Sequence, residues 1–264
     1  MGGRKDTPWS YQDELGEWHS TSGIKPKPFM RPALKENVGK VKKIMFHINS
    51  LGKGGAERVI VNLSEQLSFM GLDCVIATEW QDKDEYPLDS SVRRIDVGVG
   101  DDEEKYSSSK LRSVRRKKLN DAILAEKPDA LVCFCRNANY RGILAAKGTG
   151  VPVIISVRSD PKIDYASSKQ KVLSGILYKK ADGAVFQTEG QRDFFPKYIR
   201  EKSTIILNPV SDKYLNVPVP EVKEKTIVHS GRLVDFKNQP MLIRAFLKVH
   251  EKHPDVQIYV GHLD

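Results

Sequence analysis

The stretch that decides the fold is Val41-Lys-Lys-Ile-Met-Phe-His-Ile48, with Leu51-Gly-Lys-Gly-Gly-Ala-Glu-Arg58 just behind it. The first segment has the length and apolar content of a buried β-strand. The second is a glycine-rich turn that opens a helix over Glu57–Met70, where apolar residues recur at helical spacing. Gly71 stands where a helix C-terminal cap belongs. Strand, glycine turn and helix together form the start of a βαβ unit.

The same alternation of strand and helix continues along the chain. Strands are predicted at Cys74–Ala77, Arg94–Val97, Ala130–Phe134, Val153–Val157, Gly183–Gln187, Ser203–Leu207, Thr226–His229 and Val256–Val260. Helices are predicted at Ser109–Glu126, Ala138–Lys147, Lys169–Lys180, Glu189–Phe195 and Gln239–His250. Such a pattern predicts an α/β fold built on a doubly wound parallel sheet, as in Rossmann-like domains.

Shifts in composition divide the chain into four parts. Residues 1–40 are proline-rich without apolar periodicity and are expected to be a disordered or loosely attached extension. Residues 41–210 form the first α/β domain, and 211–224 carry the prolines of a linker. Residues 225–264 begin a second domain with one βαβ unit, which cannot cover both faces of its own sheet. We therefore expect an incomplete second domain.

Composition excludes several classes of protein. The 264 residues include 39% hydrophobic and 29% charged residues, which is ordinary for a water-soluble domain. Three cysteines are too few for a disulfide framework. The longest apolar run, Val151–Val157, has the length of a strand and not of a membrane span. The expected location is the cytoplasm, with peripheral attachment at the inner face of the membrane as an option, and the net charge of +9 suits anionic partners.

The first glycine turn has the properties of an anion site. Free N–H groups at a helix N-terminus attract phosphate, and Gly54 and Gly55 allow close approach of a ligand. The dinucleotide fingerprint is only partly met, because Glu57 occupies the place of the third glycine. The second strand also lacks the usual closing acidic residue, since Glu79 there is followed by Trp80. A tight turn without a ligand is the alternative.

A second glycine turn, at Gly231, joins the strand and helix of the second segment. Arg232 and Lys237 stand five residues apart on this loop, just before the helix. Two cations near a helix N-terminus suit a diphosphate, although two solvated surface cations would give the same pattern.

Taken together, four motifs in this order resemble the family 4 retaining glycosyltransferases, which have the two-domain GT-B fold. The motifs are Gly54-Gly-Ala-Glu-Arg-Val-Ile-Val-Asn-Leu63, Ile155-Ser-Val-Arg-Ser-Asp-Pro161, Asn208-Pro-Val210 and Gly231-Arg-Leu-Val-Asp-Phe-Lys-Asn-Gln239. The resemblance covers about residues 42–264, and it is greatest to the subgroup that builds surface polysaccharides.

The resemblance implies transfer of a sugar, with retention, from a nucleotide-sugar (a UDP-sugar) to a glycan or lipid-linked acceptor. It implies that Gly54, Gly55 and Gly231 lie near the donor phosphates, and that Arg232 and Lys237 stabilise the departing diphosphate. Arg158 and Asp160 follow a strand end and are further candidates for catalysis. No cofactor and no metal is implied.

The sequence departs from the family in one respect. Family members carry two glutamates seven residues apart later in the second domain, and this chain ends at Asp264 before such a pair. The donor site is therefore expected to be partly missing. Two alternatives stay open: a non-catalytic acceptor-binding fragment or half of a split enzyme, and a Rossmann-type NAD-dependent oxidoreductase.

Three further signals bear on partners. The basic helix over residues 109–126 suits an anionic membrane or a lipid diphosphate, or it is a solvated helix surface; no nucleic-acid-binding signature accompanies it. Cys133 and Cys135 lack the other ligands of a zinc site. Asp82 and Asp84 are interpreted as a solvated turn, not a metal site, and His47 as a core histidine.

Overall fold

The computed structural model describes residues 9–12, 18–21, 41–208, 224–231 and 233–261. The chain divides into two compact units, Met1–Pro209 (unit 1) and Val210–Asp264 (unit 2), each described here by itself. The linker predicted at 211–224 lies outside the described residues except for Glu224.

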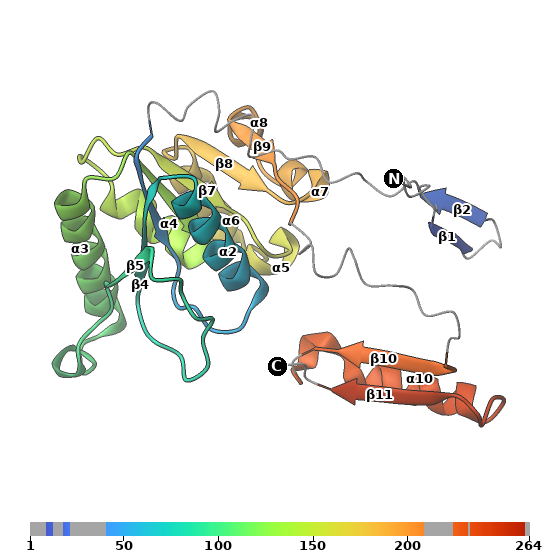
Figure 1. Cartoon of the computed structure of the whole chain (residues 1–264). Coiled ribbons are helices and arrows are strands. Elements are labelled where there is room, and N and C mark those ends of the chain that lie inside the picture. Colours follow the sequence, from blue (N-terminus) through green and yellow to red (C-terminus); the bar gives the residue numbers. More distant parts are fainter. Residues whose placement is uncertain (1–8, 13–17, 22–40, 209–223, 232, 262–264) are drawn as a thin grey trace, which may run out of the picture. The chain divides into compact units, whose positions relative to one another are not determined.

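Unit 1 contains one seven-stranded sheet in which every pairing is parallel (Figure 1). The strand order is β5-β4-β3-β6-β7-β8-β9, so β3 lies between β4 and β6 and the order reverses there. The strands are β3 (Lys43–His47), β4 (Asp73–Thr78), β5 (Val92–Asp96), β6 (Ala130–Phe134), β7 (Val153–Ser156), β8 (Gly183–Phe186) and β9 (Ser203–Ile205). This arrangement confirms the predicted doubly wound α/β fold.

Helices cover both sides of the sheet because the crossovers run in two directions. The crossover from β3 to β4 carries α2, and the crossovers that run the other way carry α3, α4 and α6; right-handed connections put these two sets on opposite sides. The long helices are α2 (Gly55–Phe69), α3 (Ser108–Glu126), α4 (Arg136–Ala145) and α6 (Ser168–Tyr178). The short ones are η1 (Asp101–Glu103), α5 (Pro161–Asp164), α7 (Glu189–Asp193) and α8 (Lys197–Arg200).

Two apolar clusters fill the space on the two sides of the sheet. Adjacent residues of β3 point to opposite sides, so Phe46 packs with Ile60 of α2 and Met45 packs in the cluster that contains Leu119 of α3 and Ile143 of α4. All of these side chains are buried. The near-continuous apolar character of the strands follows from burial on both sides.

A buried group of charges lies directly after β4. The Glu79 carboxylate pairs with Arg141 of α4, lies 3.5 Å from Nε of Arg115 of α3, and lies 3.5 Å from Nε2 of His47 on β3. Glu79 is 3% exposed, so these contacts lie away from water. Removing one partner of such a group leaves an uncompensated buried charge. The group therefore ties α3 and α4 to the sheet.

Unit 2 is a single βαβ unit with a short 3₁₀ turn. Strands β10 (Thr226–Ser230) and β11 (Gln257–Gly261) pair in parallel, joined by η2 (Asp235–Lys237) and α10 (Gln239–His250). Many apolar side chains of this unit are exposed, among them Val228, Leu233 and Met241.

The remaining described residues belong to the predicted extension. There β1 (Trp9–Gln12) and β2 (Trp18–Thr21) form an antiparallel pair that the sequence pattern did not predict. The other residues of 1–40 lie outside the described part of the chain. Within that part, no helix is long and apolar enough to span a membrane.

The pH dependence of stability should reveal the buried histidine. His47 is fully buried with Nδ1 3.0 Å from the Ala77 carbonyl oxygen, as expected for a core histidine, and burial lowers its pKa from 6.5 to about 3. In the unfolded chain the His47 ring binds a proton below about pH 6.5, whereas in the folded chain it does so only below about pH 3. Stability contributed by the neutral ring is therefore present above pH 6.5 and is lost as the pH falls through this window.

We expect unit 1 to lose about 1 kcal/mol of unfolding free energy between pH 7 and 5.5 through this group alone. The measurement is urea unfolding at both pH values, comparing the native sequence with His47→Gln, which keeps a donor for the Ala77 carbonyl. An equal loss in both proteins would contradict the assignment.

Candidate functional site

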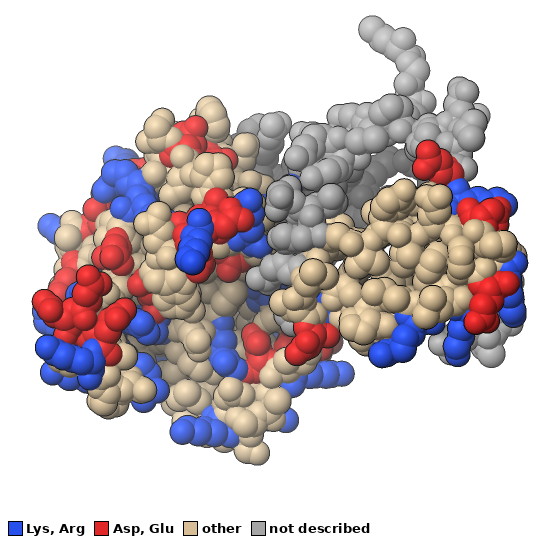
Figure 2. All heavy atoms as spheres, turned by 90° about the horizontal axis from the view of Figure 1, so that it is seen from below, with Lys and Arg blue, Asp and Glu red and all other residues tan. Residues whose placement is uncertain are grey.

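The candidate site lies at the carboxyl edge of the sheet, where the loops after β3, β6, β7 and β9 emerge together. All strands are parallel, so these loops share one edge, and ligands of open α/β sheets bind there, beside the reversal of strand order. Figure 2 looks at the molecule from below in Figure 1 and shows Lys, Arg, Asp and Glu side chains intermixed over the described residues.

The glycine turn between β3 and α2 combines one crowded and one open position. Gly54 is the N-cap of α2 and carries no side chain to cap the helix. A Cβ placed on Gly54 would lie 2.2 Å from Oε2 of Glu57, whereas a Cβ on Gly55 would meet nothing within 4 Å. The first turn of α2 thus adjoins open space at Gly55, with the Glu57 carboxylate beside it.

Charged side chains of the loop after β4 contact this turn. Lys53 Nζ lies 2.9 Å from Oδ1 of Asp84, and a Cβ on Gly52 would lie 2.5 Å from Oδ2 of Asp82. The two aspartates predicted to be a solvated turn therefore border the glycine turn. Within the described residues, no group of three His, Cys, Asp or Glu side chains could hold a metal ion.

Arg158, one of the predicted site residues, lies just past the end of β7. Its guanidinium donates to Oδ1 of Asn208 and lies 5.1 Å from the ring centre of Phe134. Burial lowers the pKa of this guanidinium, although the group keeps its positive charge at neutral pH. The contact joins two motifs that are fifty residues apart in the sequence, the one after β7 and the one after β9.

Asp160, the other candidate beside Arg158, has a structural contact. It is the N-cap of α5, and its Oδ1 accepts a hydrogen bond of 2.9 Å from the Lys162 N–H. The side chain is exposed. A capping contact accounts for an aspartate before Pro161 without any role in chemistry.

Cys135 was missed as a site residue by the sequence reasoning, which treated it only as half of a cysteine pair. It follows β6 with φ of 73°, a conformation that non-glycine residues seldom adopt and that concentrates at functional sites. Burial raises its pKa to about 12, with Glu57 and Asp164 adding negative charge and Arg158 opposing them. The charges of Glu57 in the first turn of α2 and of Arg158 thus both act on the Cys135 thiol, and no sequence pattern predicts a positive φ there.

Unit 2 brings together two of its three predicted residues. The side chain of Lys237 lies over Gly231, since a Cβ on Gly231 would come within 4.0 Å of Cδ and Cε of the lysine. Lys237 ends η2, two residues before α10 begins. Arg232 lies outside the described residues.

The acidic residue nearest the end of β4 cannot contact the ribose of a bound dinucleotide. Glu79 is buried against Arg141 and Arg115, whereas a dinucleotide site needs an acidic side chain open to the ligand. The oxidoreductase alternative therefore has no support.

The fold is that of the doubly wound α/β proteins, and the candidate site lies at the sheet edge where such proteins bind ligands. The chain belongs to Glycosyltransferase Family 4, whose model matches residues 53–214, more than half of its length. The motif at Gly54, the Arg158 motif and Asn208 all fall inside this match.

Two curated relatives come from Campylobacter jejuni. One is the GalNAc-α-(1→4)-GalNAc-α-(1→3)-diNAcBac-PP-undecaprenol α-1,4-N-acetyl-D-galactosaminyltransferase, 26% identical over 77% of this chain and 56% of its own length. The other is the N-acetylgalactosamine-N,N′-diacetylbacillosaminyl-diphospho-undecaprenol 4-α-N-acetylgalactosaminyltransferase, 25% identical over 79% of this chain and 60% of its own length. The chain thus spans a little over half the length of these relatives.

A solved structure supports the fold. Anabaena Alr3699/HepE in complex with UDP and glucose superposes with a TM-score of 0.62 at 14% sequence identity, over 84% of this chain and 62% of that one. The resemblance to the GT-B fold predicted from the four motifs is confirmed.

Paired variants of Asp160 should separate its capping role from any chemical role. Asp160→Ala is expected to cost about 0.5–1 kcal/mol of unfolding free energy through loss of the cap, whereas Asp160→Asn keeps the acceptor oxygen and the stability. Thermal unfolding of both variants measures this. Equal destabilisation by the two substitutions would show that the charge, not the cap, stabilises α5.

Proposed function

We propose that this chain is part of a glycosyltransferase that moves a sugar, with retention of configuration, from a UDP-sugar to a glycan or lipid-linked acceptor in surface-polysaccharide synthesis. The observation that carries the proposal is the family match across the carboxyl-edge site, which includes Gly54 and Arg158. The Campylobacter jejuni relatives are named for N-acetylgalactosaminyl transfer to undecaprenol-diphosphate saccharides, and the Anabaena structure holds UDP.

In this proposal, the bond between the sugar's anomeric carbon and the diphosphate oxygen breaks as the acceptor oxygen bonds to the same carbon. The acceptor's proton passes to the leaving phosphate, and UDP departs. Negative charge grows on the diphosphate during this step, so fixed cations beside it stabilise the transition state. Lys237 and Arg232 are proposed for that role in unit 2.

The residues of the carboxyl edge have proposed roles of their own. Gly55 offers space for the donor phosphates at the N-terminus of α2. Gly54, the preceding residue, and Gly231 of unit 2 are proposed to let the backbone approach the same phosphates. Arg158, held by Asn208 and Phe134, presents a cation at the acceptor side. The Glu57 carboxylate, which would repel a phosphate, is the end of a flexible side chain that can turn away. Asp160 remains a weaker candidate, since capping accounts for it.

Peripheral contact of α3 with an anionic membrane is part of the proposal. The helix carries six cations in the stretch that begins at Lys110. Several of these are already engaged within the protein: Arg115 with Glu79, Lys117 with Asp121 and Lys118 with Glu103. The charge of α3 available to a membrane is therefore smaller than its sequence indicates.

Transfer is tested with the purified protein, a panel of UDP-sugars led by UDP-N-acetylhexosamines, and saccharide-diphosphate-lipid acceptors. Release of UDP that depends on the acceptor, with an α-linked product from an α-linked donor by NMR, is the expected result. Acceptor binding without UDP release would favour the acceptor-binding alternative, and inversion of the anomeric centre would refute retention.

The glycine turn allows stability and function to be separated. Gly55→Ala should leave the unfolding free energy unchanged or raise it by about 0.5–1 kcal/mol, because alanine suits a helix better and the position is open. The same methyl group would occupy the space proposed for the donor phosphates, so we expect UDP-sugar affinity to fall at least about tenfold.

Isothermal titration with the donor measures this affinity, and Gly190→Ala is the matched control. Gly190 lies in α7, where a Cβ would meet only the Thr188 hydroxyl at 4.0 Å. Unchanged donor affinity in Gly55→Ala would remove this turn from the donor site.

A further inference from the structure

Trp80 places an exposed aromatic ring at the carboxyl edge of the sheet. It comes two residues after β4 and is 42% exposed. The other exposed aromatic side chains between residues 41 and 208 lie elsewhere: Phe69 ends α2, at the opposite edge of the sheet, and the Tyr198 hydroxyl donates to a backbone carbonyl of α6. A large exposed aromatic side chain at the edge where such sheets bind ligands points to a contact with a ligand.

The backbone of Trp80 is fixed by the strands on either side of β4. Its N–H donates to the Asn49 carbonyl oxygen at 3.2 Å, and its own carbonyl oxygen accepts a hydrogen bond of 3.1 Å from Nη2 of Arg94 on β5. Asn49 lies between β3 and the glycine turn, so these bonds hold Trp80 beside that turn. A side chain that is positioned before the ligand arrives loses less entropy on binding.

The rest of the loop after β4 is held to the same turn. The Glu85 carboxylate accepts hydrogen bonds from the N–H groups of Leu51 at 3.2 Å and of Asp82 at 2.9 Å, and it pairs with Arg94. Gly52 also forms an isolated antiparallel bridge with Glu85. The loop that carries Trp80 and the glycine turn therefore form one connected surface of unit 1.

One face of the Trp80 ring contacts the buried charges. The Arg115 guanidinium of α3 lies over the ring, 5.9 Å from its centre, and Nε of the same arginine lies 3.5 Å from the Glu79 carboxylate. The Trp80 side chain is still 42% exposed, so ring surface is left for a second contact. Trp80 thus has one side toward the protein and another that is open to a ligand.

The polar neighbours of the ring suit a sugar. Gln81 is exposed and Asp82 is partly exposed. An amide and a carboxylate bind hydroxyl groups, and a carboxylate repels a phosphate. A pyranose has a face of C–H groups that packs on an aromatic ring and a rim of hydroxyl groups that form hydrogen bonds. A saccharide therefore fits this surface better than a nucleotide does.

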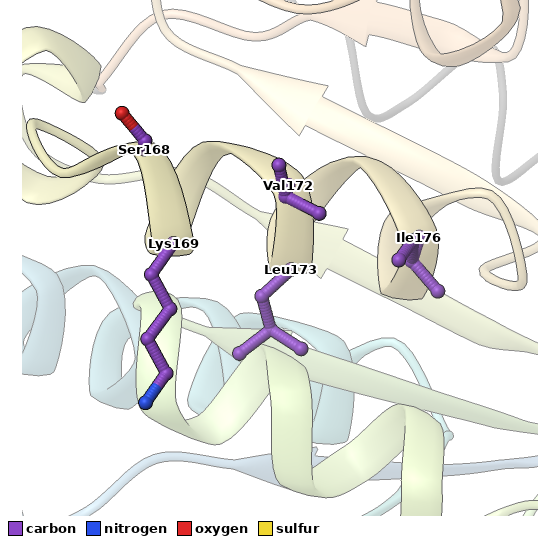
Figure 3. A pocket seen from close by; sticks show the side chains of 5 residues that line it. All are labelled: Ser168, Lys169, Val172, Leu173 and Ile176. Carbon is purple, nitrogen blue, oxygen red and sulfur yellow. The ribbon is translucent and has the colours of Figure 1, made fainter.

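An exposed apolar surface elsewhere on unit 1 lacks this combination. Figure 3 shows a groove along α6, with a volume of about 410 Å³, lined by Val172, Leu173 and Ile176 and by Ser168 and Lys169 at its N-terminal end. None of these five lining residues is aromatic, so the groove offers no flat ring to a sugar. The α6 groove is therefore a control surface for tests of Trp80.

We propose that Trp80 is a specificity-determining residue that stacks on a sugar ring of the acceptor, while Gln81 and Asp82 bind its hydroxyl groups. The assignment to the acceptor rests on the proposed transferase function. In that function the donor phosphates belong to the first turn of α2 and to unit 2, which leaves the loop after β4 to the saccharide that receives the sugar. Binding of a saccharide to Trp80 can be measured without any donor.

Tryptophan fluorescence tests this binding directly. The chain has three tryptophans, Trp9, Trp18 and Trp80, so Trp9→Phe with Trp18→Phe leaves the Trp80 indole as the reporter. The probes are the methyl glycosides of N-acetylgalactosamine, N-acetylglucosamine, galactose and glucose at millimolar concentrations. We expect at least one of them to change the emission saturably and to protect the ring from acrylamide. Sorbitol, a polyol without a ring, and UDP should do neither.

Steady-state kinetics separate a contact with the acceptor from a structural role. Trp80→Leu keeps an apolar cover over the Glu79–Arg115 pair but removes the ring, so we expect the KM for the saccharide acceptor to rise at least about tenfold. The KM for the UDP-sugar and kcat should stay within about twofold, and Trp80→Tyr should recover most of the acceptor affinity. Leu173→Ala, in the α6 groove, is the matched control and should change neither KM.

Three results would overturn the proposal. The first is an emission that none of the glycosides changes, and the second is a change on addition of UDP alone, which would assign the ring to the nucleotide. The third is a Trp80→Leu protein that is less stable in thermal unfolding and loses kcat and both affinities together, which would make Trp80 a cover for the buried charges.

Failure of this proposal differs from failure of the proposed function. Transfer with an unchanged acceptor KM in Trp80→Leu would refute the stacking contact and leave the transferase intact. Saccharide binding at Trp80 without any transfer would refute the transferase and leave the contact intact.

Discussion

The parallel pairing of β3 with β4 on one side and β6 on the other is the constraint on which the rest of unit 1 depends. It reverses the strand order at β3, sends α2 to one side of the sheet and α3, α4 and α6 to the other, and brings the loops after the strands to one carboxyl edge, where ligands of such sheets bind. The two helix layers bury most of the central strands, whereas the edge strands β5 and β9 are partly exposed. Polar groups that are buried at the carboxyl edge need a partner in the protein, in a ligand or in bound water.

Two situations occur along that edge. Directly after β4, Glu79 is paired with arginines from α3 and α4 and has become part of the core. Further along the sheet, after β6 and β7, Cys135 and Arg158 are half-buried, and the charges of Arg158 and of Glu57 in the first turn of α2 both act on the Cys135 thiol. The edge thus has a structural half around Glu79 and a half suited to ligands around Arg158. The family match covers both halves.

Much of the fold could be predicted from the sequence, because regular elements leave a periodic trace. The strand Ala130–Phe134 and the helix Gln239–His250 have the predicted bounds, and the ends of the other predicted elements differ by at most two residues. The short helices α5 and α8 were not predicted, since four residues are too few to show a period. Gly71 has a φ of 91°, which agrees with its predicted capping place.

The candidate site was less accessible from the sequence. The motifs placed Gly54, Gly55 and Arg158 on loops, but they did not show which residues these contact. The contact of Arg158 with Asn208 spans fifty residues, and the position of Glu57 beside Gly54 depends on one side-chain conformation. Asp160 appeared equivalent to Arg158 until its capping bond was seen.

By itself, the sequence determined the order and type of the elements, the parallel α/β architecture and the family, because hydrophobic periodicity and short motifs are local properties of the chain. Only the tertiary structure decided which charges are buried, which loops meet at the carboxyl edge, and that Val172, Leu173 and Ile176 of α6 point away from the core. These depend on contacts between residues far apart in the chain, and a helix that is apolar on two sides does not reveal in its sequence which side will be covered.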